Sequence, residues 1–182
     1  MRKAVFLDRD GVINRAVLRD GKAYTPTTLE NFEIIPGVEE AIRSLRDAGF
    51  LIIVVTNQPD VATGIQSQAT VNAMHSILFA KNLCDDVKVC FHTDLDKCEC
   101  RKPKPGMLLA AAREWNIDLK RSFMVGDRWR DISAGVAAGC FTFFIDYNYK
   151  EQRPEQPDAV VQSLQEASIM ILSDLVRGGR FG

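Results

Sequence analysis

Short apolar runs alternate with amphipathic stretches along most of the chain. The apolar runs are continuous and rich in β-branched residues, which is typical of strands buried on both faces of a sheet. They predict strands at Lys3–Leu7, Leu51–Val55, Val87–Phe91, Ser122–Val125, Cys140–Ile145 and Ala159–Val161. Apolar residues at helical spacing predict helices at Gly37–Ala48, from a Ser67 cap to about Asn82, and at Gly106–Trp115, Trp129–Ala138 and Leu164–Val176.

Strands that alternate with helices predict an α/β fold. The arrangement expected is a three-layer, doubly wound parallel sheet with helices on both faces. The 182 residues are enough for one domain with a sizeable core, so a single domain over residues 1–182 is expected. The polar stretch Lys150–Pro157 is expected to be a surface connector, and Gly178–Gly182 a frayed tail.

The charge balance and the apolar runs narrow the classes of function. Lys plus Arg number 23 and Asp plus Glu 24, which argues against a nucleic-acid-binding protein or a polybasic membrane protein. The longest apolar run, Phe50–Val55, is far below the roughly 20 residues that cross a bilayer, and the N-terminal apolar run is too short for a signal peptide. We therefore expect a cytoplasmic protein, by default a monomer.

Polar residues follow four of the predicted strands directly, where ligands bind in parallel sheets. We expect them to meet at one edge of the sheet, here called the rim. They come from four separate segments: Asp8 and Asp10, then Thr56 and Asn57, then Cys90 and His92, then Asp127, Arg128 and Asp131.

Asp8 and Asp10 can face one pocket if the chain bends after the first strand, and Gly11 permits a tight turn. Because like charges this close shift one pKa relative to the other, one carboxylate could stay ionised as a nucleophile. Its neighbour could then hold a proton as general acid. A solvated turn explains the same residues equally well when they are taken alone.

Asp8 and Asp127 together provide the carboxylates that Mg²⁺ needs. Asp131 either holds a water ligand of that ion or caps a helix. A phosphate would need donors and cations, which Thr56, the Thr56–Asn57 amides and Arg101-Lys102 can supply. Arg101 and Lys102 taken alone also fit a solvated loop.

Cys90-x-His92 and Cys98-x-Cys100 place four soft ligands within eleven residues. This pattern predicts a tetrahedral structural Zn²⁺ site, since an odd number of clustered cysteines does not suit a disulfide framework. The site comes directly before Arg101, so we expect zinc to shape the loop that delivers Arg101 and Lys102. His75, within a helix, is expected to be a packed or surface histidine rather than a base.

Four motifs in order resemble those of the haloacid dehalogenase superfamily: FLDRDG, VVTNQ, the lysine of CRKPKPG, and VGDRWRD. The resemblance implies that Asp8 becomes an aspartyl-phosphate and that Asp10 protonates the leaving oxygen and then activates water. It also implies that Mg²⁺ is held by the Asp8 side chain, the Asp10 carbonyl and Asp127, while Thr56 and Lys102 orient the phosphoryl group. Candidate substrate-binding residues are Asn57, Arg101, Lys102 and Arg128.

Within this superfamily the chain is most similar to the zinc-containing branch, which holds heptose bisphosphate phosphatases and histidinol-phosphate phosphatases. NFEIIPGV and GMLLAAARE favour the heptose group, in which the 7-phosphate of a phosphorylated sugar is removed. The short loop between His92 and Cys98, and Thr63 in place of an arginine, keep histidinol phosphate open as the alternative. A non-catalytic zinc-binding interaction domain is a third hypothesis. About 25 residues between Gly11 and the first core helix are too few for a cap domain, so a capless fold is expected.

Overall fold

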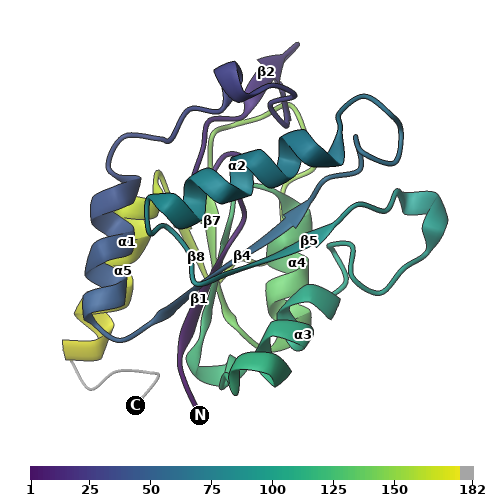
Figure 1. Cartoon of the computed structure of the whole chain (residues 1–182). Coiled ribbons are helices and arrows are strands. Elements are labelled where there is room, and N and C mark those ends of the chain that lie inside the picture. Colours follow the sequence, from purple (N-terminus) through teal and green to yellow (C-terminus); the bar gives the residue numbers. More distant parts are fainter. Residues whose placement is uncertain (177–182) are drawn as a thin grey trace.

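A six-stranded parallel sheet forms the centre of the molecule (Figure 1). The computed structural model describes residues 1–176, so the tail predicted at Gly178–Gly182 lies outside the described residues. From one edge to the other, the strands are β5 (Asp86–Cys90), β4 (Leu51–Asn57), β1 (Ala4–Leu7), β6 (Phe123–Gly126), β7 (Phe141–Ile145) and β8 (Ala159–Val161). Every neighbouring pair is parallel, which confirms the predicted sheet.

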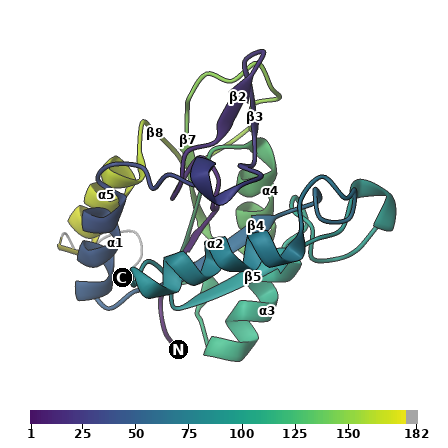
Figure 2. The ribbon, with the colours of Figure 1, turned by 45° about the horizontal axis from the view of Figure 1, so that its top comes forward.

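Helices cover both faces of the sheet and give the predicted three layers. They are α1 (Val38–Asp47), α2 (Gln68–Ala80), α3 (Gly106–Trp115), α4 (Trp129–Ala138) and α5 (Leu164–Val176). Helices α1 and α5 lie side by side on one face, and α3 and α4 lie on the other (Figures 1 and 2).

Alternation along the central strands divides the core into two clusters. Val5 and Leu7 of β1 pack with α1, α2 and α5, whereas Ala4 and Phe6 pack with α3 and α4. All four side chains have no exposed surface. A strand buried on both faces has a continuous run of apolar residues, which is why β1 could be predicted from the sequence.

The helix ends follow the local sequence signals. Ser67 accepts a hydrogen bond from the Thr70 amide at the start of α2, as its predicted role as N-cap requires. Gly139, with φ of 85°, ends α4 in the left-handed conformation that glycine adopts without strain.

The strand order places β1 at the point where the chain changes direction across the sheet. From β1 the chain builds outward to β4 and β5, and then returns to add β6 on the other side of β1. Ligands of open α/β sheets bind at such a switch point, beyond the carboxyl ends of the strands. Asp8, which directly follows β1, occupies this position.

A β-hairpin stands above the rim where the sequence predicted only loop. Its strands, β2 (Val17–Arg19) and β3 (Lys22–Tyr24), are antiparallel and pair Arg19 with Lys22 (Figure 2). The two-residue turn is Asp20-Gly21, and both residues have positive φ, as the favoured hairpin turns require. The segment between Gly11 and α1, which was expected to be too short for a cap domain, thus carries a hairpin. The remaining described elements are three short 3-10 helices at Leu29–Asn31, Asp94–Asp96 and Leu119–Arg121. No helix among residues 1–176 is both long enough and apolar enough to span a bilayer.

Replacing Leu45 by Ala should lower the free energy of unfolding by about 2–5 kcal/mol, because this fully buried side chain of α1 would leave a cavity. Urea unfolding measures the change. The same replacement at Leu95, which is 90% exposed, is the matched control and should stay within about 0.5 kcal/mol. Equal effects at the two positions would contradict this account of the core.

Candidate active site

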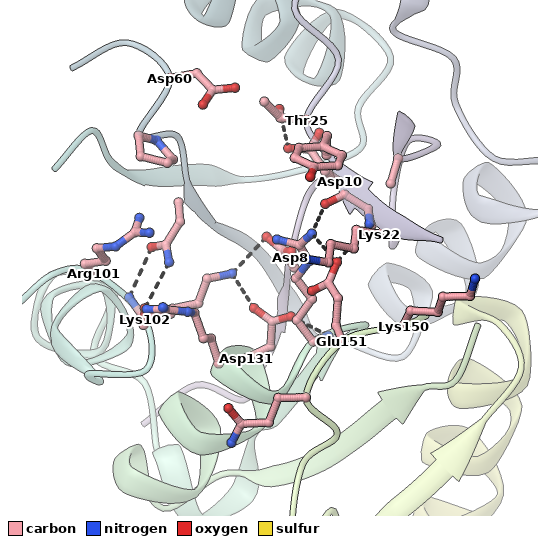
Figure 3. A pocket seen from close by; sticks show the side chains of 18 residues that line it. Asp8, Asp10, Lys22, Thr25, Asp60, Arg101, Lys102, Asp131, Lys150 and Glu151 are labelled. Atoms are coloured by element: carbon pink, nitrogen blue, oxygen red, sulfur yellow. Dashed lines mark hydrogen bonds and ion pairs between the residues drawn. The ribbon is translucent and has the colours of Figure 1, made fainter. Parts of the chain in front are cut away.

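The rim surrounds an open cavity of about 720 Å³. Of the residues proposed from the sequence, Asp8, Asp10, Asn57, Arg101, Lys102 and Arg128 line it, and so does Asp131. They come from the ends of β1 and β4, from the loop before α3, and from the start of α4. Figure 3 shows Asp8, Asp10, Arg101, Lys102 and Asp131 around the cavity. Thr56 and Asp127 do not line the cavity but lie at the ends of β4 and β6.

Lys102 is the buried cation of the site. Its Nζ donates hydrogen bonds to Oδ1 of Asp8 at 2.8 Å and to the Val55 carbonyl at 2.7 Å, and it lies 2.6 Å from Oδ1 of Asp131. Only 2% of its side chain is exposed. Burial disfavours the charged ammonium, but Asp131 and Asp8 outweigh that effect and raise the pKa of Lys102 to about 12.

Asp127 is a buried carboxylate without a normal hydrogen bond. Neither of its oxygens has a hydrogen-bond partner of normal geometry among the described residues. Tyr149 lies nearby, and burial, followed by the Asp127 charge, raises the pKa of its phenol. Gly11 makes room for it, because a Cβ at Gly11 would lie 2.0 Å from Oδ2 of Asp127. A buried carboxylate left unpaired in this way is costly unless a cation binds it.

Asp8, Asp127 and Asp131 can offer ligand oxygens that all lie within 4.8 Å of one another. Burial, and then the neighbouring carboxylates, raise the pKa of Asp8 to about 6 and that of Asp127 well above its usual value. Lys102 is the one ammonium in contact with these carboxylates, and the nearby Arg128 is itself paired with Glu151. Negative charge therefore exceeds positive charge here when all three carboxylates are ionised. The donor set and its charge fit a divalent cation with oxygen ligands.

Asp10 is held differently from the sequence expectation. Arg9 contacts both of its oxygens at 3.0 Å, and Thr25 and Gln58 donate to Oδ2 at 2.7 and 2.8 Å. Burial alone would raise the pKa of Asp10, but Arg9, followed by the hydrogen bonds from Thr25 and Asn14, lowers it below its usual value. In the protein without a bound ion or substrate, these contacts favour the ionised form of Asp10, and its role as proton donor stays a prediction.

His75 supports Arg9 from α2. Its Nε2 lies 3.3 Å from the Arg9 guanidinium, and only 6% of the residue is exposed. Burial, and then the Arg9 charge, lower the pKa of His75 to about 4, so the neutral ring accepts a hydrogen bond from Arg9. His75 is a packed residue as expected, but it also belongs to the network that holds Asp10.

Asn57 binds the backbone of Lys102. Its side-chain amide donates to the Lys102 carbonyl at 3.0 Å, and its side-chain oxygen accepts from the Lys102 amide at 3.1 Å. Thr56, which is 1% exposed, accepts from Gln58 at 2.9 Å. Asn57, which was expected to bind substrate, thus also holds the loop that carries Lys102. Thr56, which was expected to bind phosphate, is also held by Gln58.

Cys90, His92, Cys98 and Cys100 come together as predicted. Five of their six ligand-atom separations lie between 3.1 and 3.7 Å. A tetrahedral zinc with Zn–S bonds of about 2.3 Å sets its ligands roughly 3.8 Å apart, so the four ligand atoms are close enough together to surround one zinc ion. Without a metal ion, burial raises the pKa of Cys90 and Cys100, whereas hydrogen bonds, first from the Arg101 backbone, outweigh burial at Cys98 and lower its pKa to about 7.

The cysteine–histidine cluster is tied to the rim. Arg101 donates to Asp94 at 2.8 Å and to the His92 carbonyl at 3.2 Å, and Arg130 of α4 contacts the same Asp94 at 2.9 Å. Gly106, at the start of α3, lies so near the cluster that a Cβ there would be 2.1 Å from the Glu99 carbonyl. These contacts connect the cluster to the loop that carries Arg101 and Lys102, and the expectation that zinc shapes this loop stays a prediction.

The hairpin and the segment 146–157 form a wall that the sequence did not indicate. Glu151 accepts a hydrogen bond from the Ala23 amide at 2.8 Å and pairs with Arg128 at 3.0 Å, and Arg128 also donates to the Ala23 carbonyl. The predicted surface connector is thus part of the cavity. The Asp-Gly turn could have revealed the hairpin, but nothing in the sequence links Glu151 to it.

The sequence model of the haloacid dehalogenase-like hydrolase family matches residues 11–139, more than half of the chain. The chain belongs to this family. A D-glycero-β-D-manno-heptose-1,7-bisphosphate 7-phosphatase of Rhodopseudomonas palustris is 40% identical over 150 residues, covering 76% of this chain and 80% of the relative. A D-glycero-D-manno-heptose-1,7-bisphosphate 7-phosphatase of Thermosynechococcus vestitus is 35% identical and covers 96% of this chain and 97% of its own.

A solved structure shares this fold closely. D,D-heptose 1,7-bisphosphate phosphatase from B. bronchiseptica, complexed with magnesium and phosphate, superimposes with a TM-score of 0.80. It is 30% identical and covers 94% of this chain and 98% of its own. This haloacid dehalogenase-like hydrolase therefore carries its Asp8 cavity on a framework that binds magnesium and phosphate in a relative.

Replacing Asn57 by Ala should lower the free energy of unfolding by about 1–3 kcal/mol, because the Lys102 amide loses its acceptor. The rate of phosphate release should fall roughly 100-fold, because the Lys102 ammonium loses its fixed position. Asn72, exposed on α2, provides the matched Asn→Ala control. An Asn57→Ala enzyme that works at the parent rate would show that this pair of hydrogen bonds does not position Lys102.

Proposed function

We propose that this hydrolase removes the 7-phosphate of D-glycero-D-manno-heptose 1,7-bisphosphate through an aspartyl-phosphate on Asp8. The observation that carries the chemistry is a carboxylate at the end of β1 that lies 2.8 Å from a buried ammonium and beside the unpaired Asp127. The names of the relatives support the substrate. We take the chain to act as one domain.

Asp8 attacks phosphorus, and the bond from phosphorus to the sugar oxygen breaks. Lys102, held by Asp8 and Asp131, lies where it can neutralise a phosphoryl oxygen. Asp10 gives its proton to the leaving oxygen. Because the negative phosphate raises the pKa of a nearby carboxyl group, substrate binding opposes the effect of Arg9 and favours the protonated form.

In the second step Asp10 takes a proton from water, whose oxygen attacks the phosphorus of the aspartyl-phosphate. Phosphate leaves and the Asp8 carboxylate is restored. The two steps replace one difficult displacement with two easier ones. Thr56 and the Thr56–Asn57 amides at the end of β4 are assigned to orienting the phosphoryl group. Asn57, Arg101 and Arg128 are assigned to binding the substrate.

The side chains of Asp8 and Asp127 and the Asp10 carbonyl are assigned as ligands of Mg²⁺. A bound magnesium ion would supply positive charge to the phosphoryl oxygens and keep Asp8 and Asp127 ionised. Asp131 accepts a hydrogen bond from the Arg128 amide at 3.0 Å and so caps α4, and it also binds Lys102. Both contacts favour the capping role that the sequence left open.

Cys90, His92, Cys98 and Cys100 are assigned to a structural zinc ion. All four positions of a tetrahedron are filled by the protein, so no ligand position is left for substrate.

Two alternatives lose support. The relatives described above act on a heptose bisphosphate by name, which favours that substrate over histidinol phosphate. A non-catalytic zinc-binding domain has no need of the Asp8, Lys102 and Asp127 arrangement, and membership of a hydrolase family argues against it. A cytoplasmic monomer that binds neither nucleic acid nor membrane stays a prediction.

The purified protein with Mg²⁺ should release phosphate from the heptose bisphosphate with kcat/KM at least about tenfold higher than from histidinol phosphate, equivalent to roughly 1.4 kcal/mol. Asp8→Asn should lower the rate by roughly 10³-fold or more, because the nucleophile is lost. Asp47→Asn, an exposed change at the end of α1, is the matched control. Equal rates on the two substrates would overturn the substrate, and an active Asp8→Asn enzyme would overturn the mechanism.

Elemental analysis should find about one zinc per chain, and Cys98→Ser should lose it, because one of four ligands is removed. Cys140→Ala, a change at a cysteine outside the cluster, should keep the metal. Zinc removal should also speed hydrogen exchange in residues 91–105. A metal-free protein with unchanged exchange and full activity would be incompatible with the assignment.

A further inference from the structure

Two lysines line the cavity wall formed by the hairpin and the segment 146–157. Lys22 begins β3, and Lys150 belongs to the segment after β7. Figure 3 shows both on the side of Asp8 opposite Arg101. Both side chains are exposed, so a ligand in the cavity could reach them.

These lysines differ from the other cavity-lining cations in having no partner. Among the described residues, neither Lys22 nor Lys150 forms an ion pair or a side-chain hydrogen bond. Each of the other four is paired with a carboxylate: Arg101 and Arg130 with Asp94, Lys102 with Asp8 and Asp131, and Arg128 with Glu151. The free positive charge of the cavity is therefore concentrated on one wall.

The backbone holds the two lysines next to each other. The Lys150 amide donates to the Gly21 carbonyl at 2.8 Å, and Gly21 directly precedes Lys22. A Cβ on Gly21 would lie 2.8 Å from Cδ of Lys150, so the aliphatic part of Lys150 packs on the hairpin turn. Glu151 joins the same two segments through the Ala23 amide. The pair is thus part of one braced wall rather than of two independent loops.

A bisphosphate substrate needs a second anion site away from the carboxylates. Once one phosphate occupies Asp8 and Lys102, the nearby Asp127 and Asp131 repel another anion. We infer that Lys22 and Lys150 bind the phosphate that is not hydrolysed, and so select a bisphosphate over a monophosphate. Two ammonium groups complement the charge of a phosphate dianion, and each can donate hydrogen bonds to it. This inference rests on the proposed function and deepens it.

The test compares the heptose 1,7-bisphosphate with the heptose 7-phosphate, using Lys22→Ala, Lys150→Ala and the double variant. The double variant should lose about 100-fold in kcat/KM for the bisphosphate, mainly through KM. The loss for the monophosphate should be at least tenfold smaller, because it has no second phosphate. Lys22→Arg keeps the charge and should retain most of the preference, and Lys120→Ala removes a positive charge remote from the cavity as a control.

Equal losses on both substrates, or no loss on the bisphosphate, would overturn the inference. Failure of the proposed function looks different, because the parent enzyme would then release no phosphate from the heptose bisphosphate. In that case, calorimetric binding of fructose 1,6-bisphosphate and fructose 6-phosphate to the Asp8→Asn protein with Mg²⁺ tests the lysines without turnover. A preference for the bisphosphate that disappears in Lys22→Ala/Lys150→Ala supports the subsite, and identical binding by both proteins excludes it.

Discussion

The buried ammonium of Lys102, shared between Asp8 and Asp131, requires support from much of the surrounding structure. An ammonium and two carboxylates removed from water are stable only when their geometry is well fixed. The Val55 carbonyl accepts a hydrogen bond from the Lys102 ammonium, and Asn57 binds the backbone on both sides of the Lys102 α-carbon. On the other side of the loop, Arg101 donates to the His92 carbonyl of the cysteine–histidine cluster. These supports come from β4 and from the loop before α3, so the position of one side chain depends on distant parts of the chain.

The central sheet was predictable from the sequence because its strands are buried on both faces. Continuous apolar runs mark β1, β4 and β6, and α3, α4 and α5 have the bounds expected from their helical spacing. Polar ends were harder to predict, since β4 continues through Thr56 and Asn57, which pair with Val89 and Cys90. The apolar pattern could not show where β4 ends, because its backbone hydrogen bonds to β5 continue for two residues after the last apolar side chain.

The site was predictable in its residues but less so in its electrostatics. Asp8, Lys102 and Asp127 meet because each follows a strand or lies in a loop at the same edge of the sheet. The lowered pKa of Asp10 was not predictable from two nearby aspartates, because it depends on Arg9 turning back toward its neighbour. Arg9 in turn contacts His75 of α2, which is distant in the sequence. The role of Glu151 was equally hidden, since its contact with Ala23 joins residues 128 positions apart.

The strand order also bears on how the protein is made. Lys102 is 94 residues beyond Asp8, and β6, which covers the second edge of β1, is later still. During synthesis β1 can pair with β4 while its other edge waits for β6, and an open edge can pair with other chains. Until β6 has been synthesised, the nascent chain therefore has only the β1, β4 and β5 side of the sheet, and it has Asp8 and Lys102 without Asp127. Asp127 directly follows β6, so the last of the proposed catalytic carboxylates and the strand that covers the second edge of β1 are synthesised together.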